Sequence, residues 1–238
     1  MVKTTLFYFY SMKKELQLTS EDKVKIIDTT IPIQDYLPIT ISSLNKDLSN
    51  FDISSSIAWE TYIDAFLKKN KATVAFGGYL EKRDIYKRSS HFNNDSNEER
   101  NIHLGIDLWC KAGTKVLAVS DGEIHSFKNN KNYGDYGPTI ILKHVVNTVT
   151  FFSLYGHLSL ESIQDIKEGQ YIKKGEVIGY LGNNDVNGDY APHLHFQLMK
   201  DIGNYKGDYP GVCSEKDIDF YKDNCMNPNL LLKLPNEI

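Results

Sequence analysis

The chain has 238 residues, of which 41% are hydrophobic and 24% are charged, so a buried core is expected and disorder over most of the length is not. The net charge of -4 and the lack of a long Lys/Arg run argue against nucleic acid as a partner, because nucleic-acid-binding domains usually carry a basic patch. No apolar run approaches the ~20 residues that a membrane-spanning helix needs, so we predict no transmembrane segment.

The N-terminal sequence MVKTTLFYFYSMKK has neither the sustained apolar run nor the small-residue cleavage site of a signal peptide, which by itself predicts a cytoplasmic location. The three cysteines are Cys110, Cys213 and Cys225, and an odd number does not make a disulfide framework. Cys213 and Cys225 can pair across a short loop, but free thiols in a reducing compartment agree better with the missing signal.

Residues 1–76 are predicted to form an N-terminal appendage of extended segments and one amphipathic helix. The helix is expected because five apolar residues recur at the i, i+3, i+4, i+7 and i+8 spacing: Trp59, Tyr62, Ile63, Phe66 and Leu67. Ser56 is the expected N-cap, and the apolar stripe is expected to dock on the main domain.

Residues 77–200 are predicted to form a β-rich domain, because short apolar runs of strand length alternate there with Gly, Asp and Asn turns. Asp121-Gly122, between two such runs, predicts a hairpin. Residues 201–238 are predicted to be a C-terminal wrapping extension with an apolar anchor at Leu230, Leu231 and Leu232.

Residues 111–118 and 173–180 share a Lys-x-Gly-x-x-apolar-apolar-small pattern. Two half-barrel hairpins with the same turn would produce this echo, and so would a chance similarity between two glycine turns that precede strands.

One group of polar residues has the spacing of a metal site. His103 and Asp107 are four apart in HLGID, and residues i and i+4 of a strand share a face. His193 and His195 are two apart in HLHFQL and also share a face. Two His and one Asp, with a fourth position left for water, are the ligands of a catalytic zinc site. Spacing alone leaves open which member of the His193/His195 pair binds the metal.

The remaining histidines of this group are suited to acid–base chemistry. His157 in LYGHLS and the second member of the HLH pair can accept a proton from water or stabilise an oxyanion, because imidazole titrates near neutral pH. A Glu base of the HExxH type is absent from the sequence. The other three histidines, His91, His125 and His144, are expected to be structural or to face solvent.

In this order, HLGID, LYGHLS and PHLHF resemble the lysostaphin/LytM-type zinc metalloendopeptidases, a peptidoglycan DD-metalloendopeptidase-like family with the motifs H-x-x-x-D, G-H and H-x-H. The resemblance covers roughly residues 100–199. It implies that one zinc ion is held by His103, Asp107 and His195, and that His157 and His193 are the catalytic pair.

The resemblance also implies a mainly β fold, with an antiparallel sheet or half-barrel of the duplicated hybrid motif type. The implied activity is the hydrolysis of peptide bonds in peptidoglycan or in similar short, flexible peptides, and the implied location is the cell envelope. The residues that bind the substrate and the oligomeric state are not predicted. The loops at residues 128–138 and 182–192 are interpreted as groove walls, with Asn129, Asn130 and Tyr133 in the first of them.

Other functions remain possible from the sequence. The three alternatives are a non-catalytic binding or regulatory module, a lipoyl-like carrier, and a domain with a purely structural metal. A degenerate relative usually lacks metal ligands, whereas none is missing here. A carrier needs a modifiable lysine at a hairpin tip, which Lys173 and Lys174 do not clearly provide. An open fourth coordination position argues against a structural metal.

Overall fold

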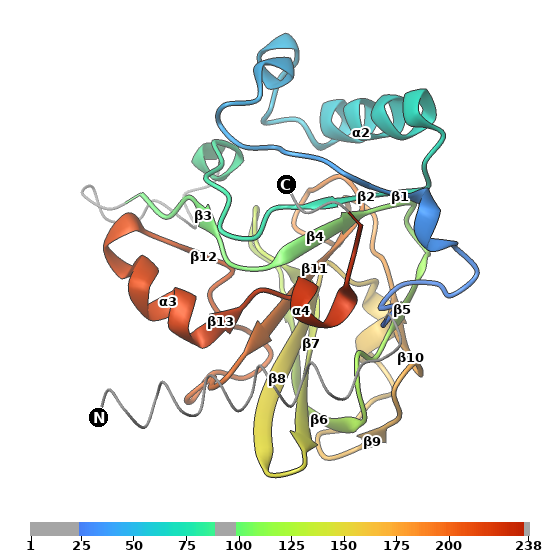
Figure 1. Cartoon of the computed structure of the whole chain (residues 1–238), viewed down its shortest axis with the longest axis vertical. Helices are drawn as coiled ribbons and strands as arrows, with labels where there is room; N and C mark the ends of the chain where they lie inside the picture. Colours follow the sequence, from blue (N-terminus) through green and yellow to red (C-terminus); the bar gives the residue numbers. More distant parts are fainter. Residues whose placement is uncertain (1–23, 89–98, 236–238) are drawn as a thin grey trace.

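The computed structural model describes residues 24–88 and 99–235, so the N-terminal sequence and His91 lie outside the described residues. Within these ranges a nine-stranded sheet dominates, in the order β1-β2-β4-β11-β8-β7-β6-β9, with β13 paired to β11 (Figure 1). All its neighbours are antiparallel except β1 and β2. The expectation of a mainly β fold with an antiparallel sheet is confirmed.

The strands of the large sheet are β1 (Tyr36–Pro38), β2 (Val74–Gly77), β4 (Ile106–Trp109), β6 (Gly122–Asn130), β7 (Gly137–Val146), β8 (Val149–Gly156), β9 (Tyr171–Ile172), β11 (His193–Met199) and β13 (Cys225–Met226). Two small sheets pair β5 (Lys115–Leu117) with β10 (Val177–Tyr180) and β3 (Ile102–His103) with β12 (Val212–Cys213). The helices are α2 (Ser56–Asn70), α3 (Ile218–Asn224), α4 (Asn229–Leu232) and the short 3-10 turns η1 (Ile33–Asp35), η2 (Lys46–Asn50), η3 (Ile85–Arg88), η5 (Leu160–Ile163) and η6 (Glu215–Asp217).

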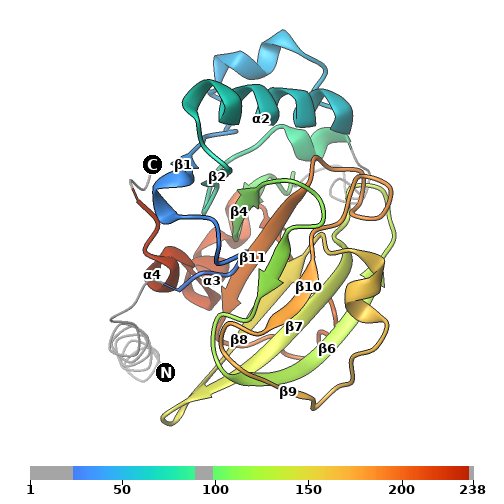
Figure 2. The same cartoon turned by 90° about the vertical axis from the view of Figure 1, so that its right-hand side faces the viewer.

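Helix α2 is the predicted amphipathic helix, and it lies beside the β1/β2 end of the sheet (Figure 2). Its buried apolar residues Trp59, Ile63 and Leu67 pack in one cluster with Trp109 of β4, so the predicted docking is confirmed. The N-cap is Ser55, whose side chain accepts a hydrogen bond from the Ala58 amide, and not the predicted Ser56.

The large sheet continues into the predicted appendage. Strand β2 pairs with β4, so that Ala75 stands opposite Trp109, and β1 extends the edge further. The boundary between residues 76 and 77 therefore falls inside a strand, and the predicted division into domains stays a prediction.

The hairpin predicted at Asp121-Gly122 is wrong. Strand β5, before the turn, pairs with β10, whereas β6, after the turn, pairs with β7. The chain bends at residues 119–121, and this bend leads from one sheet to another. Its Asp121 carboxylate accepts a hydrogen bond from the Lys174 amide, which ties the turn to the neighbouring loop.

The sequence echo corresponds to a repeated turn. Thr114 N donates to Lys111 O and Glu176 N donates to Lys173 O, at 3.2 and 3.0 Å. The third residue of both turns is glycine with a left-handed φ, 80° at Gly113 and 77° at Gly175. The strands that follow, β5 and β10, pair with each other.

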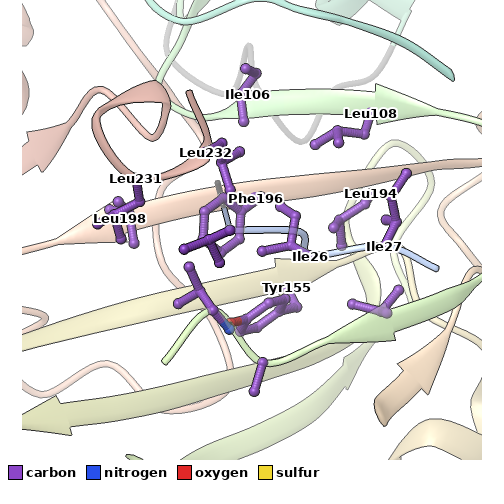
Figure 3. Packing of buried hydrophobic residues seen from close by; sticks show 14 of the residues in the cluster. Ile26, Ile27, Ile106, Leu108, Tyr155, Leu194, Phe196, Leu198, Leu231 and Leu232 are labelled. Atoms are coloured by element: carbon purple, nitrogen blue, oxygen red, sulfur yellow. The ribbon is translucent and has the colours of Figure 1, made fainter. Parts of the chain in front are cut away.

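The main core lies on one face of the sheet. Phe196 of β11 and Tyr155 of β8 pack with their ring centroids 5.2 Å apart, and Figure 3 shows Ile26, Ile27, Leu231 and Leu232 gathered around them. The predicted C-terminal anchor is confirmed for Leu231 and Leu232, which are buried, while Leu230 is partly buried. None of the described helices has the length and apolar character to cross a membrane.

Candidate metal centre

Strands β4 and β11 bring two of the predicted ligands together. Their register sets His195 opposite Asp107, and directly opposed residues project from the same face of a sheet. His103 comes from β3, which pairs with β12 and not with a strand of the large sheet. The expectation that His103 and Asp107 share one strand is therefore wrong, because the chain breaks between them into two strands with different partners.

The donor atoms of these three residues converge at a buried point. The Oδ1 atom of Asp107 lies 3.3 Å from His103 Nε2 and 3.2 Å from His195 Nδ1. The two histidine nitrogens lie 2.8 Å apart. Donors bound to a tetrahedral zinc ion at ~2.0–2.1 Å lie about 3.3 Å from one another, so two of the three separations match this geometry. The donor set fits a divalent metal of the zinc type.

Hydrogen bonds on the far side of each ring orient the two histidines. His103 Nδ1 donates to the Gly78 carbonyl oxygen at 2.8 Å, and His195 Nε2 donates to Gln197 Oε1 at 3.0 Å. A neutral imidazole that donates from one nitrogen keeps a lone pair on the other. The lone pairs are therefore on His103 Nε2 and His195 Nδ1, the two atoms that face Asp107, as in many protein metal sites.

His157 and His193 lie side by side next to this point, with ring centroids 4.2 Å apart. Their Nδ1 atoms donate to the carbonyl oxygens of Asn187 and Ala191, at 2.7 and 2.8 Å, which leaves both Nε2 atoms as acceptors. His193 Nε2 lies 3.8 Å from Asp107 Oδ1. His157 has a left-handed φ of 62°, a conformation that non-glycine residues adopt mainly where function or the surroundings require it.

Burial keeps three of the site histidines, His103, His157 and His193, neutral. It lowers the pKa of His103 to about 4, with a further contribution from the Arg83 charge and an opposing one from Asp107. It also lowers the pKa of His193, and it holds the pKa of His157 well below its usual range. Burial alone would raise the pKa of Asp107, but the interaction with His103, including a side-chain hydrogen bond, and the positive charge of Arg83 hold that pKa well below its usual range. Neutral imidazoles and an ionised carboxylate are the forms that bind metals.

The converging residues line a cavity of about 220 Å³. Its walls are rich in aromatic side chains: Trp59, Tyr86, Trp109, Tyr136, Tyr190 and Tyr209. Of the two loops interpreted as groove walls, residues 182–192 contribute Tyr190 and Ala191, and residues 128–138 contribute Gly134, Asp135 and Tyr136. Asn129, Asn130 and Tyr133 do not line the cavity, and Asn130 instead donates to the Gly207 carbonyl oxygen.

Two residues at the site were not anticipated from the sequence. Gln197 follows His193 and His195 at the same spacing of two, so its presence on their strand face was available from the sequence. Arg83, whose Nη1 lies 2.5 Å from Asp107 Oδ2, is 24 residues away in sequence and carries no motif.

The two other histidines that the structure describes, His144 and His125, are not part of the site. His144 is buried, and its two ring nitrogens lie within hydrogen-bond distance of Asp121 O and Ser153 Oγ. His125 is half-buried beside Phe152 and does not line the cavity.

Comparison with known proteins agrees with the motifs. Residues 101–208 match the model of Peptidase family M23. Lysostaphin of Staphylococcus staphylolyticus is 35% identical over 98 residues, which are 41% of this chain and 18% of that protein. Peptidoglycan DD-endopeptidase ShyC of Vibrio cholerae is 31% identical over 98 residues, 41% of this chain and 20% of that protein. The chain thus spans about a fifth of the length of these relatives.

Among solved structures, the catalytic domain of lysostaphin from Staphylococcus simulans matches with a TM-score of 0.37 and 26% sequence identity. That match covers 64% of this chain and 94% of the lysostaphin domain.

Proposed function

We propose that this chain is a zinc-dependent endopeptidase that hydrolyses peptide bonds in peptidoglycan or in similar short, flexible peptides. The match of residues 101–208 to the model of Peptidase family M23 supports the proposal. One observation carries the proposal: His103, Asp107 and His195 converge on one buried point beside two neutral histidines, at the wall of a cavity. The name of the relative ShyC, a peptidoglycan DD-endopeptidase, supports peptidoglycan as the substrate and the cell envelope as the site of action.

The three converging residues would hold the ion through His103 Nε2, Asp107 Oδ1 and His195 Nδ1. Zinc, when bound, polarises the scissile carbonyl and lowers the pKa of its water toward ~7. Three protein ligands leave one position for water or substrate, as a catalytic site requires. The hydrogen bonds from His103 to Gly78 and from His195 to Gln197 would keep the two imidazoles in the binding orientation.

His157 and His193 would supply the proton transfer. Each has its Nδ1 proton bound to a carbonyl oxygen and an Nε2 lone pair, so either ring can take a proton from the attacking water. The imidazolium so formed can then donate that proton from Nε2 to the leaving amine. The second histidine of the pair would stabilise the oxyanion when it is protonated. Asp107 Oδ1, 3.8 Å from His193 Nε2, favours that positive charge on His193.

A purely regulatory role is not favoured, because the donor set that a degenerate relative would lose is complete and mutually close.

The test combines metal content with product analysis. We expect the purified protein to hold one zinc per chain by elemental analysis, and to release fragments from purified peptidoglycan that mass spectrometry identifies as cleaved at peptide bonds. His103→Ala should lose both the zinc and the activity. His125→Gln, a half-buried histidine outside the cavity, is the matched control and should keep both. A folded wild-type protein that binds no divalent metal would contradict the proposal.

A further inference from the structure

The two oxygen atoms of Asp107 have different partners. Oδ1 faces the histidine nitrogens, whereas Oδ2 lies 2.5 Å from Arg83 Nη1. Both side chains are buried, with 2% and 3% of their surface exposed. The charge-assisted hydrogen bond to the guanidinium fixes the orientation of the carboxylate, so that Oδ1 is the oxygen turned toward the histidine nitrogens.

Arg83 is itself held in place from two sides. Its Nε donates to Glu81 Oε2 at 2.7 Å, and its Nη1 also lies 3.4 Å from the Tyr86 hydroxyl. The other oxygen of Glu81 accepts hydrogen bonds from Thr40 Oγ1 and the Ile41 amide, at 2.6 and 3.0 Å. The contacts therefore run without a break from residues 40–41 through Glu81 and Arg83 to Asp107.

The same segment also orients His103. The Gly78 carbonyl oxygen accepts a hydrogen bond from His103 Nδ1. Gly78 itself has a φ of 106°, a backbone conformation that favours glycine. A Cβ atom at this position would lie only 1.8 Å from Arg83 Nη2 and 2.9 Å from His103 Nδ1. Residue 78 must therefore be glycine for Arg83 and His103 to keep their positions.

We propose that residues 78–83, which precede the family domain at residues 101–208, are a working part of the metal site, with Arg83 as the positioning residue that limits Asp107 to a single donor oxygen. The inference rests on the proposed metal site. It goes beyond that proposal because it assigns a role in metal binding to a segment outside the matched domain.

Charge and position can be separated with two variants. E81Q/R83Q removes one negative and one positive charge, so the net charge is unchanged while the contact to Oδ2 is lost. R83K keeps the positive charge but loses the planar two-sided arrangement of the guanidinium. We expect E81Q/R83Q to bind zinc roughly 10–100-fold more weakly than the wild type in a competition titration with a chromophoric chelator, the usual range for a partner of a metal ligand, and R83K to lie between the two.

The cobalt spectrum gives a second readout that a loss of stability alone does not change. If Asp107 offers both oxygens in the variants, Co²⁺ gains a ligand, and its visible absorption falls below that of the four-coordinate wild-type complex. Lys87→Gln is the matched control, because Lys87 is only four residues after Arg83 but 58% of its side chain is exposed, in ion pairs with Asp84 and Glu99. It should leave both the zinc affinity and the spectrum unchanged.

The outcomes separate the two proposals. If the wild type binds no divalent metal, the proposed function fails. If the wild type binds zinc and folded E81Q/R83Q binds it equally tightly with the same cobalt spectrum, only the role of Arg83 is overturned. Should E81Q/R83Q not fold, as judged by circular dichroism, R83K decides: a zinc affinity and cobalt spectrum equal to those of the wild type overturn the inference.

Discussion

The two faces of the large sheet use the same strands for different purposes. Along β11 and β8, His195 stands opposite Gly156, and the next pair, Phe196 and Tyr155, projects from the other face. The first face carries the candidate metal centre and lines the cavity, while the second is the main apolar core. The alternation of side chains along a strand thus separates chemistry from packing by one residue.

Buried histidines on the two faces differ in how their nitrogens are satisfied. On the core face, His144 donates from Nδ1 to Asp121 O at 2.8 Å, and its Nε2 lies 2.6 Å from Ser153 Oγ, so both nitrogens have fixed neutral partners. On the cavity face, the Nδ1 atoms of His157 and His193 donate to backbone carbonyl oxygens, whereas no backbone carbonyl oxygen in the described part of the chain is hydrogen-bonded to either Nε2 atom. A buried histidine with one nitrogen fixed and the other left toward a cavity is suited to chemistry.

The largest expected effect comes from removing one imidazole of the cavity face. His157→Asn should lower kcat/KM for peptide hydrolysis by roughly 10²–10⁴-fold, the usual contribution of a general acid or base. Asn is chosen because, like His, it tolerates the left-handed φ of 62° at this position. Elemental analysis should find the zinc content unchanged. If the variant lost its zinc along with its activity, His157 would be a metal ligand, and the distinction between the metal ligands and the proton-transferring histidines would fail.

The core-face histidine should instead affect stability, and only in acid. Burial lowers the pKa of His144 to about 4, against the opposing hydrogen bond to Asp121, whereas an unfolded histidine titrates near 6.5. The unfolded chain therefore binds the extra proton first, so this contribution to stability is intact above pH ~6.5 and is lost as the pH falls toward 4, by about 3 kcal/mol in all.

The pH effect is measured by urea unfolding of the metal-free protein at pH 7 and at pH 4. Other buried histidines, such as His103, titrate in the same window, so the decisive quantity is a difference between proteins. His144→Asn should be less stable than the wild type at pH 7 and should lose less stability on acidification. If the wild type and His144→Asn lost the same stability between pH 7 and pH 4, His144 would already be protonated or solvated in the folded state.

Much of the difference between the cavity face and the core face can be predicted from the sequence, because it follows from local residue patterns. The alternation in HLHFQLM correctly predicts a strand, and the three motifs correctly predict the family resemblance. The i+3/i+4 spacing around Trp59 correctly predicts the helix and its docking. The same spacing of two also extends to Gln197, which lies outside the H-x-H motif.

Local patterns do not predict which strands pair with one another or which distant side chains come into contact. Asp121-Gly122 marks a turn, but nothing in it reveals that β5 pairs with β10 and not with β6. Arg83 reaches Asp107 only because β2 pairs with β4 and brings the segment after β2 alongside the site. Both are long-range pairings, which depend on the packing of the whole sheet and leave no periodic signal in the residues concerned.

A smaller effect, on zinc affinity, is expected from removing the hydrogen-bond partner of His195. Gln197 accepts the Nε2 proton of His195, and its own amide donates to Pro210 O at 3.2 Å, which fixes its orientation. Gln197→Ala should weaken zinc binding by roughly 10–100-fold, toward the lower end because the ring stays packed, as measured by competition titration. An unchanged zinc affinity would show that packing against Tyr136, 5.1 Å away between centroids, is enough to orient His195.

The smallest effect is expected from charges at the outer surface of the sheet, one residue from His144 along β7. Lys143 and Glu123 form an ion pair of 3.3 Å across β7 and β6, but 39% and 47% of their side chains are exposed. Solvent screens such a pair, so Lys143→Gln should change the free energy of unfolding by no more than about 1 kcal/mol in urea denaturation at pH 7. A larger loss would mean that the stability of β6 and β7 depends on surface charge, and the acid sensitivity assigned to His144 would then have to be measured in the Lys143→Gln background as well.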